Sequence, residues 1–355
     1  MIDRRIFLQL TSGTAAAGAV GVSTRAVAGA HTAAAAHAAP LLVQVSDGVA
    51  SPLADRLRIL SERLALATEG RLSLTALPAT GSAAPSAEAL VLACEEDYGD
   101  SEPTSLLLGG LPLGGRLGEF DIATWLMGAG GQAVWDAAAA RHGWKPLMIG
   151  EVGGDRTQVW SRSRLVTSSD FRGLRIAGPR VMHSALAGFG ARPVSLTGFE
   201  ALSALEAGEI DAFETDDPSV SLAAAYRLPR DAHWYVDSLS GRSGVISLRM
   251  PLEHWHRLSV RDQTIFQAVA AETAATLRAI HRAHHVPLVR QLRALRGTRP
   301  GLFFIAQGLL GIKAREALDS ATFEDPLFAS AFASMSALKA GSAEPTDVLR
   351  ARSSV

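Results

Sequence analysis

The chain has 355 residues, 48% of them hydrophobic and 19% charged, which is enough apolar sequence for a large core divided between two lobes. A formal net charge of −1 provides no broad basic surface, and this argues against nucleic acid and anionic membranes as partners. The expected partner is therefore a small molecule. The single cysteine, Cys94, excludes an intramolecular disulfide and a multi-cysteine metal site.

The N-terminus has the pattern of a twin-arginine export signal. An arginine pair in "MIDRRIFLQL" precedes a mild Ala/Gly-rich run that reaches Val22, and "RAVAGA" offers the small residues at which a signal peptidase cleaves. The run is too short and too weakly apolar to anchor the chain in a bilayer. We therefore expect residues 1–28 to be a signal peptide, residues 29–39 to be a flexible tether, and the mature protein to lie in the periplasm.

From Leu41 onward, short apolar strands alternate with helical segments. The stretch "LLVQV" is strand-like, Pro52–Ala67 has helical spacing, and "RLSLTAL" at 71–77 is strand-like again. This alternation predicts the α/β fold class.

Strand-helix units continue between residues 173 and 218. The pattern predicts strands at 173–177, 193–196 and 210–213, and helices at 181–189, after a capping box at 197–200, and from Pro218 onward. Successive strand-helix-strand units build a parallel sheet.

Six carboxylates crowd the stretch "EAGEIDAFETDDP", from Glu206 to Pro218. Asp216 or Asp217 is expected to cap the helix that begins at Pro218. Glu214 stands where a parallel strand meets a helix, the edge at which open α/β sheets bind their ligands. Two roles stay open for Glu214: a ligand or ion site, and a structural carboxylate that accepts bonds from neighbouring amides.

Two other patterns compete with a binding role. The stretch "GAGGQA", followed by Glu151, mimics a dinucleotide fingerprint, which requires residues 121–127 to form a strand. His281 and His285 lie one helical turn apart, as metal ligands do, but Arg282 stands where a zinc protease needs its glutamate, so we expect a solvated helix face.

The segment "SSDFRGLRIAGPRVMHSALAGFGARPVSLTGFEALSALEAGEIDAFETDDP" resembles the core signature of the DctP-like solute-binding proteins of tripartite ATP-independent periplasmic (TRAP) transporters. The family pattern combines a D-L-x-G-L-K-I-R opening, a G-A-x-P-V strand, an E-x-x-x-A-L-x-x-G helix and a D-A-x-E strand. The matching residues are Asp170, Gly173, Leu174, Gly190, Ala191, Pro193, Val194, Glu200, Ala204, Leu205, Gly208, Asp211, Ala212 and Glu214. The resemblance covers most of the mature chain and is closest to the branch that binds 2-oxo acids.

This resemblance implies a two-lobe periplasmic binding protein fold, type II-like, with a hinge and a long connecting helix. The helix is visible as a helical composition from Ser259 to about Ala294, with Pro287 as the expected kink. The implied boundaries are 40–158 with part of about 242–295 for lobe I, 159–241 for lobe II, and 296–355 for C-terminal helices that pack across the lobes.

In the 2-oxo-acid branch, an arginine after the G-L-K-I strand holds the ligand carboxylate. A glutamine, a tryptophan and the D-A-x-E glutamate bind the ligand or an associated metal ion. Here Glu214 matches the glutamate, but Ala177 stands at the arginine position and Thr215 at the tryptophan position. The ligand-contact stretch "TQVW" adds Gln158 and Trp160 to the implied site.

The missing arginine leaves the ligand carboxylate without a countercharge at Ala177. Arg156 falls near the glutamine position, just before "TQVW", and is expected to supply that charge from the other wall. Arg175 and Arg180 are alternatives, and a solvated loop position for Arg156 also stays open.

The resemblance implies a receptor without catalysis that captures a small organic acid, a 2-oxo acid or another carboxylate, and delivers it to TRAP permease subunits. No cofactor is expected other than a metal ion bound with the ligand, for which Glu214 is the candidate. A homodimer stays open. The alternatives are an exported dinucleotide-binding oxidoreductase and a sensory relative that has lost transport.

Overall fold

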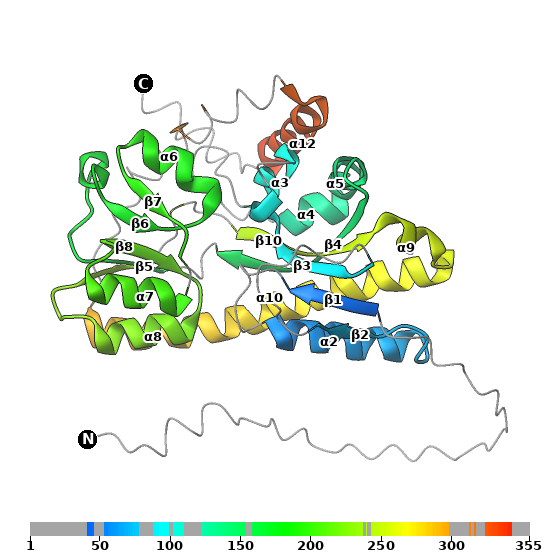
Figure 1. Ribbon diagram of the computed structural model, residues 1–355, viewed down its shortest axis with the longest axis horizontal. Coiled ribbons are helices and arrows are strands. Elements are labelled where there is room, and N and C mark those ends of the chain that lie inside the picture. Colours follow the sequence, from blue (N-terminus) through cyan, green and yellow to red (C-terminus); the bar gives the residue numbers. More distant parts are fainter. Residues whose placement is uncertain are drawn as a thin grey trace, which may run out of the picture. The chain divides into compact units, whose positions relative to one another are not determined.

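A computed structural model of the chain describes residues 41–45, 53–77, 88–98, 102–109, 122–153, 158–196, 198–236, 239, 243–297, 312–313, 316 and 324–342. The predicted signal peptide and tether lie outside these residues. All the described residues belong to one compact unit, His37–Val355. Strands and helices alternate along most of it, as the sequence predicts for an α/β fold (Figure 1).

The first sheet has five strands in the order β2-β1-β3-β10-β4. Strand β1 runs parallel to β2 and β3, whereas β10 pairs antiparallel with β3 and β4. The strands are β1 (Leu41–Val45), β2 (Leu74–Ala76), β3 (Leu90–Cys94), β4 (Trp144–Gly153) and β10 (Ser243–Pro251).

Both faces of the first sheet are covered by apolar side chains. On one face, Ile246 and Leu248 of β10 join a cluster with α2 (Leu53–Ala67) and the start of the long helix. The other face carries Val245 and packs with helices in a second cluster. The helices near that face are α3 (Pro103–Leu108), α4 (Ile122–Gly128), α5 (Gly131–Ala140) and α12 (Pro326–Ser342), and α9 (Leu252–Arg257) directly follows β10.

The second sheet also has five strands, in the order β7-β6-β8-β5-β9. Strand β6 runs parallel to β7 and β8, and β5 runs antiparallel to β8 and β9. The strands are β5 (Gln158–Ser161), β6 (Arg175–Ala177), β7 (Arg192–Val194), β8 (Ala212–Thr215) and β9 (His233–Tyr235). Its helical segments are η3 (Ser168–Phe171), η4 (Arg180–Met182), α6 (His183–Gly188), α7 (Gly198–Ala207) and α8 (Pro218–Arg227).

The predicted long helix is confirmed as α10 (Val260–Arg296). The Ser259 side chain caps it by accepting from the Asp262 amide at 3.1 Å. Phe266 packs in the cluster of the first sheet and Leu292 in that of the second, so α10 connects both sheets. Pro287 lies inside the helix, between these two packing regions.

The parallel units of the second sheet form close to where the sequence predicts them. The predicted cap is confirmed: the Asp217 carboxylate accepts from the Ser219 amide at 2.7 Å, with Pro218 at the first helical position. The strand expected at 210–213 instead occupies Ala212–Thr215, because the Ile210 amide still donates to the carbonyl of Ala204 in α7, at 3.3 Å. Among the described helices, none is long and apolar enough to cross a membrane.

Candidate functional site

The carboxyl ends of β3 and β6, one strand from each sheet, lead into two short helical turns. The first turn, η1 (Glu95–Tyr98), directly follows β3, and η4 follows β6 after Gly178 and Pro179. The two turns are in contact. Open α/β sheets bind ligands at the carboxyl ends of their strands, so this junction is the candidate solute site.

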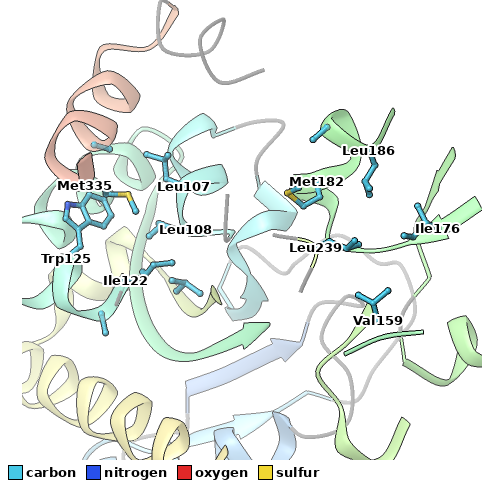
Figure 2. Close-up of a cluster of buried hydrophobic side chains, with 14 of the residues drawn as sticks. Leu107, Leu108, Ile122, Trp125, Val159, Ile176, Met182, Leu186, Leu239 and Met335 are labelled. Atoms are coloured by element: carbon cyan, nitrogen blue, oxygen red, sulfur yellow. The ribbon is translucent and has the colours of Figure 1, made fainter. Parts of the chain in front are cut away.

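The second-sheet side of this junction is apolar. Val159, Ile176, Met182, Leu186 and Leu239 are all buried and belong to one cluster. Figure 2 shows these five side chains gathered on one side of the view, with Leu107, Leu108, Ile122, Trp125 and Met335 on the other.

Glu214 lies in β8 and is half-buried. Its Oε2 atom accepts a hydrogen bond from the backbone amide of Leu239 at 2.9 Å. Leu239 belongs to the segment that connects β9 to β10, and therefore to the crossing from the second sheet to the first. The observed bond matches the structural alternative for this carboxylate, a partner for a neighbouring amide.

The other predicted site residues of β5 and β8 face away from Glu214. Gln158 pairs directly with Thr215, and Val159 with Glu214. Since side chains alternate along a strand, Gln158 and Thr215 share one face and Glu214 points to the other. The Gln158 Oε1 atom accepts from the Ser221 hydroxyl at 2.6 Å, and Thr215 Oγ1 accepts from the Asp217 amide at 3.1 Å.

Trp160 and Ala177 belong to the core of the second sheet. Both are buried in the cluster that includes α7 and α8. The Trp160 ring stacks on Trp234 with 6.1 Å between centroids, and the Arg296 guanidinium lies 5.7 Å from the Trp160 centroid. The Trp160 indole nitrogen is buried, with no hydrogen-bond partner among the described residues. The structure therefore brings Gln158, Trp160 and Thr215 to one face but not together with Glu214.

Of the candidate arginines, Arg175 is committed to a local ion pair. Its Nε and Nη2 atoms donate to Asp211 at 3.0 and 2.7 Å. The hydrogen bond from Arg175 holds the pKa of the Asp211 carboxyl below its usual range. Arg180 is exposed in η4, whereas Arg156 lies outside the described residues.

His183 follows Arg180 at the same strand end and is half-buried. Its Nε2 atom lies 3.2 Å from the carbonyl oxygen of Gly178. Burial lowers the pKa of the His183 imidazole, although the Gly178 carbonyl opposes this shift. The ring is therefore disposed to be neutral at pH 7.

A buried charged cluster on the first-sheet side was missed by the sequence reasoning. Arg249 of β10 donates to Glu95, and its Nη1 atom donates to Glu102 at 2.9 Å. Glu95 also accepts from Ser105 and Trp135. In the sequence, the cluster is indicated by Arg249 within the largely apolar strand "VISLRMP", where a charge has to be buried with a partner.

The pKa values of this cluster are shifted by burial and by mutual charge. Burial raises the pKa of the Glu102 carboxyl, and the nearby Arg249 charge opposes that shift. Burial disfavours the charged form of Arg249, but Glu95 and Glu102 outweigh this effect and raise the guanidinium pKa. The Arg249 guanidinium also lies 3.5 Å from the centroid of the Tyr98 ring in η1, so the cluster is tied to the junction.

The competing motifs have structural roles in this fold. The stretch "GAGGQA" follows helix α4 rather than a strand, so the context that a dinucleotide fingerprint requires is lacking. Glu151 instead pairs with Arg278 of α10 at 2.9 Å. The predicted solvated histidine face is wrong in one respect, because His281 and His285 are both half-buried and His281 contacts Arg56 at 3.3 Å. No group of three or more His, Cys, Asp or Glu within the described ranges is arranged to hold a metal.

Solved structures with the same fold are solute-binding proteins. A TRAP periplasmic solute-binding protein from Colwellia psychrerythraea, with bound calcium and pyruvate, is 16% identical with a TM-score of 0.73, covering 86% of this chain and 95% of that one. Another from Pseudoalteromonas atlantica T6c, with bound sodium and pyruvate, is 16% identical with a TM-score of 0.71. The match covers 86% of this chain and 94% of that one. A third from Bordetella bronchiseptica RB50, a dimer with copurified calcium and picolinate, is 19% identical with a TM-score of 0.70. The match covers 86% of this chain and 93% of that one.

These likenesses confirm the two-lobe fold of α/β type. No curated protein matches the chain. A family model, DctP, described as the bacterial extracellular solute-binding proteins of family 7, matches residues 120–298, which is half of the 355 residues. The chain therefore belongs to the DctP family of bacterial extracellular solute-binding proteins.

Proposed function

We propose that the chain is the solute receptor of a TRAP transporter, which captures a small organic acid in the periplasm and delivers it to the membrane permease. The observation that carries the proposal is the family match over residues 120–298. It is supported by the likeness in fold to TRAP solute-binding proteins with bound organic acids. Proteins of this fold work by closing two lobes on a ligand, so the proposal includes no catalytic step.

The proposed solute position is the junction of η1 and η4. A carboxylate that leaves water needs a countercharge and hydrogen-bond donors. Arg180 is exposed at the end of β6 in this junction, and we propose it with Arg156 as the source of positive charge. Ala177 cannot supply it, because alanine has no donor and this residue is buried in the core.

A cation bound together with the solute, as in the proteins with calcium or sodium, needs several oxygen ligands at one point. Gln158 and Glu214 point to opposite faces of the second sheet, and each accepts a bond from the protein. These two residues do not fit one cation site in this arrangement. Recognition is therefore proposed through the solute's own carboxylate.

A thermal-shift screen of the purified mature protein tests this function. Pyruvate, picolinate, pyroglutamate and glucuronate are the first ligands, with a neutral sugar as control. A ligand of this protein, at a free concentration of 100 times its Kd, should add about 2.7 kcal/mol to the free energy of unfolding. Native mass spectrometry of the untreated protein should also find a copurified organic acid.

Two results would contradict the receptor proposal. A stoichiometric nicotinamide or flavin on the purified protein would favour the oxidoreductase alternative. The absence of stabilisation by any small molecule in a wide panel would favour a sensory relative without a transported solute.

A further inference from the structure

The carboxylate at the solute edge of the second sheet is already engaged by the protein itself. Glu214 Oε2 accepts from the Leu239 amide at 2.9 Å, across 25 positions of sequence. A charged carboxylate that accepts a backbone amide in a half-buried place is a strong contact. The bond holds Leu239, which lies between β9 and β10, at the second sheet.

The side chain of Leu239 fills space at the same edge. It is 1% exposed and belongs to the cluster of Ile176, Met182 and Leu186. Its Cδ1 atom lies 2.8 Å from the point that a Cβ atom on Gly178 would occupy. Real Cβ contacts are almost never this short, so Leu239 packs directly on the glycine backbone at the end of β6.

The two contacts act at one place in the chain. Glu214 holds the backbone of Leu239, while Gly178 leaves room for its side chain. Leu239 is thus fixed to the second sheet by both its backbone and its side chain, and the chain joins the first sheet at Ser243 as β10.

We propose that Glu214 is a positioning residue rather than a solute or cation ligand. It fixes Leu239 over Gly178 and so shapes the apolar wall of the solute site on the second sheet. Its effect on the solute rests on the proposed function, because it requires that a solute bind at this edge. The hydrogen bond itself can be tested without any ligand.

Backbone amide exchange at Leu239 gives the ligand-free test. Glu214→Ala removes the acceptor and should accelerate exchange of the Leu239 amide at least tenfold. Glu214→Gln keeps an acceptor oxygen at the same reach and should restore protection to within about threefold of the parent. Glu209→Ala removes an exposed carboxylate five residues earlier and should leave Leu239 unaffected. Unchanged exchange at Leu239 in Glu214→Ala would overturn the proposal.

A second substitution moves Leu239 without altering Glu214. Gly178→Ala adds a methyl group where the Leu239 Cδ1 atom lies, so the Leu239 side chain must move, and the NMR signals of its methyl groups should shift. Gly128→Ala, in α4, meets no atom within 4 Å and is the matched control. This pair keeps the test decisive if Glu214→Ala does not fold. If the Leu239 methyl signals do not shift in Gly178→Ala, Leu239 does not pack on Gly178 as proposed.

Calorimetry with pyruvate, in calcium and in a chelator, separates positioning from ligation. Positioning predicts that Glu214→Gln keeps the parent affinity within threefold, both in calcium and in the chelator. A cation ligand predicts instead that Glu214→Gln loses as much affinity as Glu214→Ala and that chelation abolishes binding, and that result would overturn the proposal. If the parent binds no organic acid at all, the transport function fails, while amide exchange still decides the role of Glu214.

Discussion

Arg249 and Glu95 form a buried two-point ion pair at the carboxyl end of β3. Arg249 Nε donates to Glu95 Oε1 at 3.0 Å and Nη2 to Oε2 at 2.6 Å, and neither side chain is more than 1% exposed. The Ser247 hydroxyl, two residues before Arg249 on the same face of β10, also donates to Glu95. The pair thus joins the crossing strand β10 to η1, of which Glu95 is the first residue.

Replacing Arg249 by methionine should destabilise the protein by about 3–5 kcal/mol. The substitution leaves Glu95 and Glu102 buried without their countercharge, and an uncompensated buried charge is the costly part of a broken ion pair. Urea unfolding measures the loss. The control is Arg257→Met, which removes an exposed ion pair between Arg257 and Glu253, one turn earlier in α9. It should not change the free energy of unfolding measurably.

Glu102→Gln should remove a pH dependence of stability. Burial raises the pKa of folded Glu102 above its unfolded value of about 4.3, so the folded state binds more protons between the two values. By linkage, this carboxyl lowers stability as the pH rises through that window, and the loss persists above the folded pKa. The Glu102 Oε1 atom is also buried and has no hydrogen-bond partner in the part of the chain that the structure describes.

The free energy of unfolding of Glu102→Gln minus that of the parent should therefore increase from pH 4 to pH 8. Denaturant curves across this range give the difference directly. The same pH slope in parent and variant would show that Glu102 is not the group responsible.

Ala177→Arg should destabilise the protein without creating a solute contact. Ala177 is 1% exposed and packed among apolar side chains of the second sheet, so a guanidinium there has no room and no partner. We expect a loss of more than about 3 kcal/mol, read from thermal and urea unfolding. Ala294→Arg, on the exposed face of α10, is the matched control. A stable Ala177→Arg protein that binds carboxylates more tightly would contradict this account of the position.

Asp217→Ala should cost about 1 kcal/mol by removing the N-cap of α8. The lost contact is the bond from the Ser219 amide to the Asp217 carboxylate. Chemical denaturation measures it, and Asp217→Asn should recover most of the stability because asparagine also caps helices. Equal losses in both variants would show that the carboxylate acts by its charge and not as a cap.

The local elements could be read from the sequence because each depends on residues close together in the chain. The cap at Asp217, the long helix from Val260 and the parallel units around β6 and β8 all follow from periodicity and capping patterns. The family signature added the two-lobe arrangement. Even so, the strand expected at 210–213 began two residues later, because the Ile210 amide still bonds to the carbonyl of Ala204 in α7.

The candidate site depends on contacts that no local pattern contains. Whether Gln158 and Glu214 meet is decided by strand register, since residues paired across β5 and β8 share a face and their neighbours take the other. The sequence by itself determined the fold class and the position of Glu214 at a strand end. Only the tertiary structure decided that its carboxylate binds Leu239, and that Arg249 reaches Glu95 across 154 positions, because a buried charge takes its partner from whichever segment folds against it.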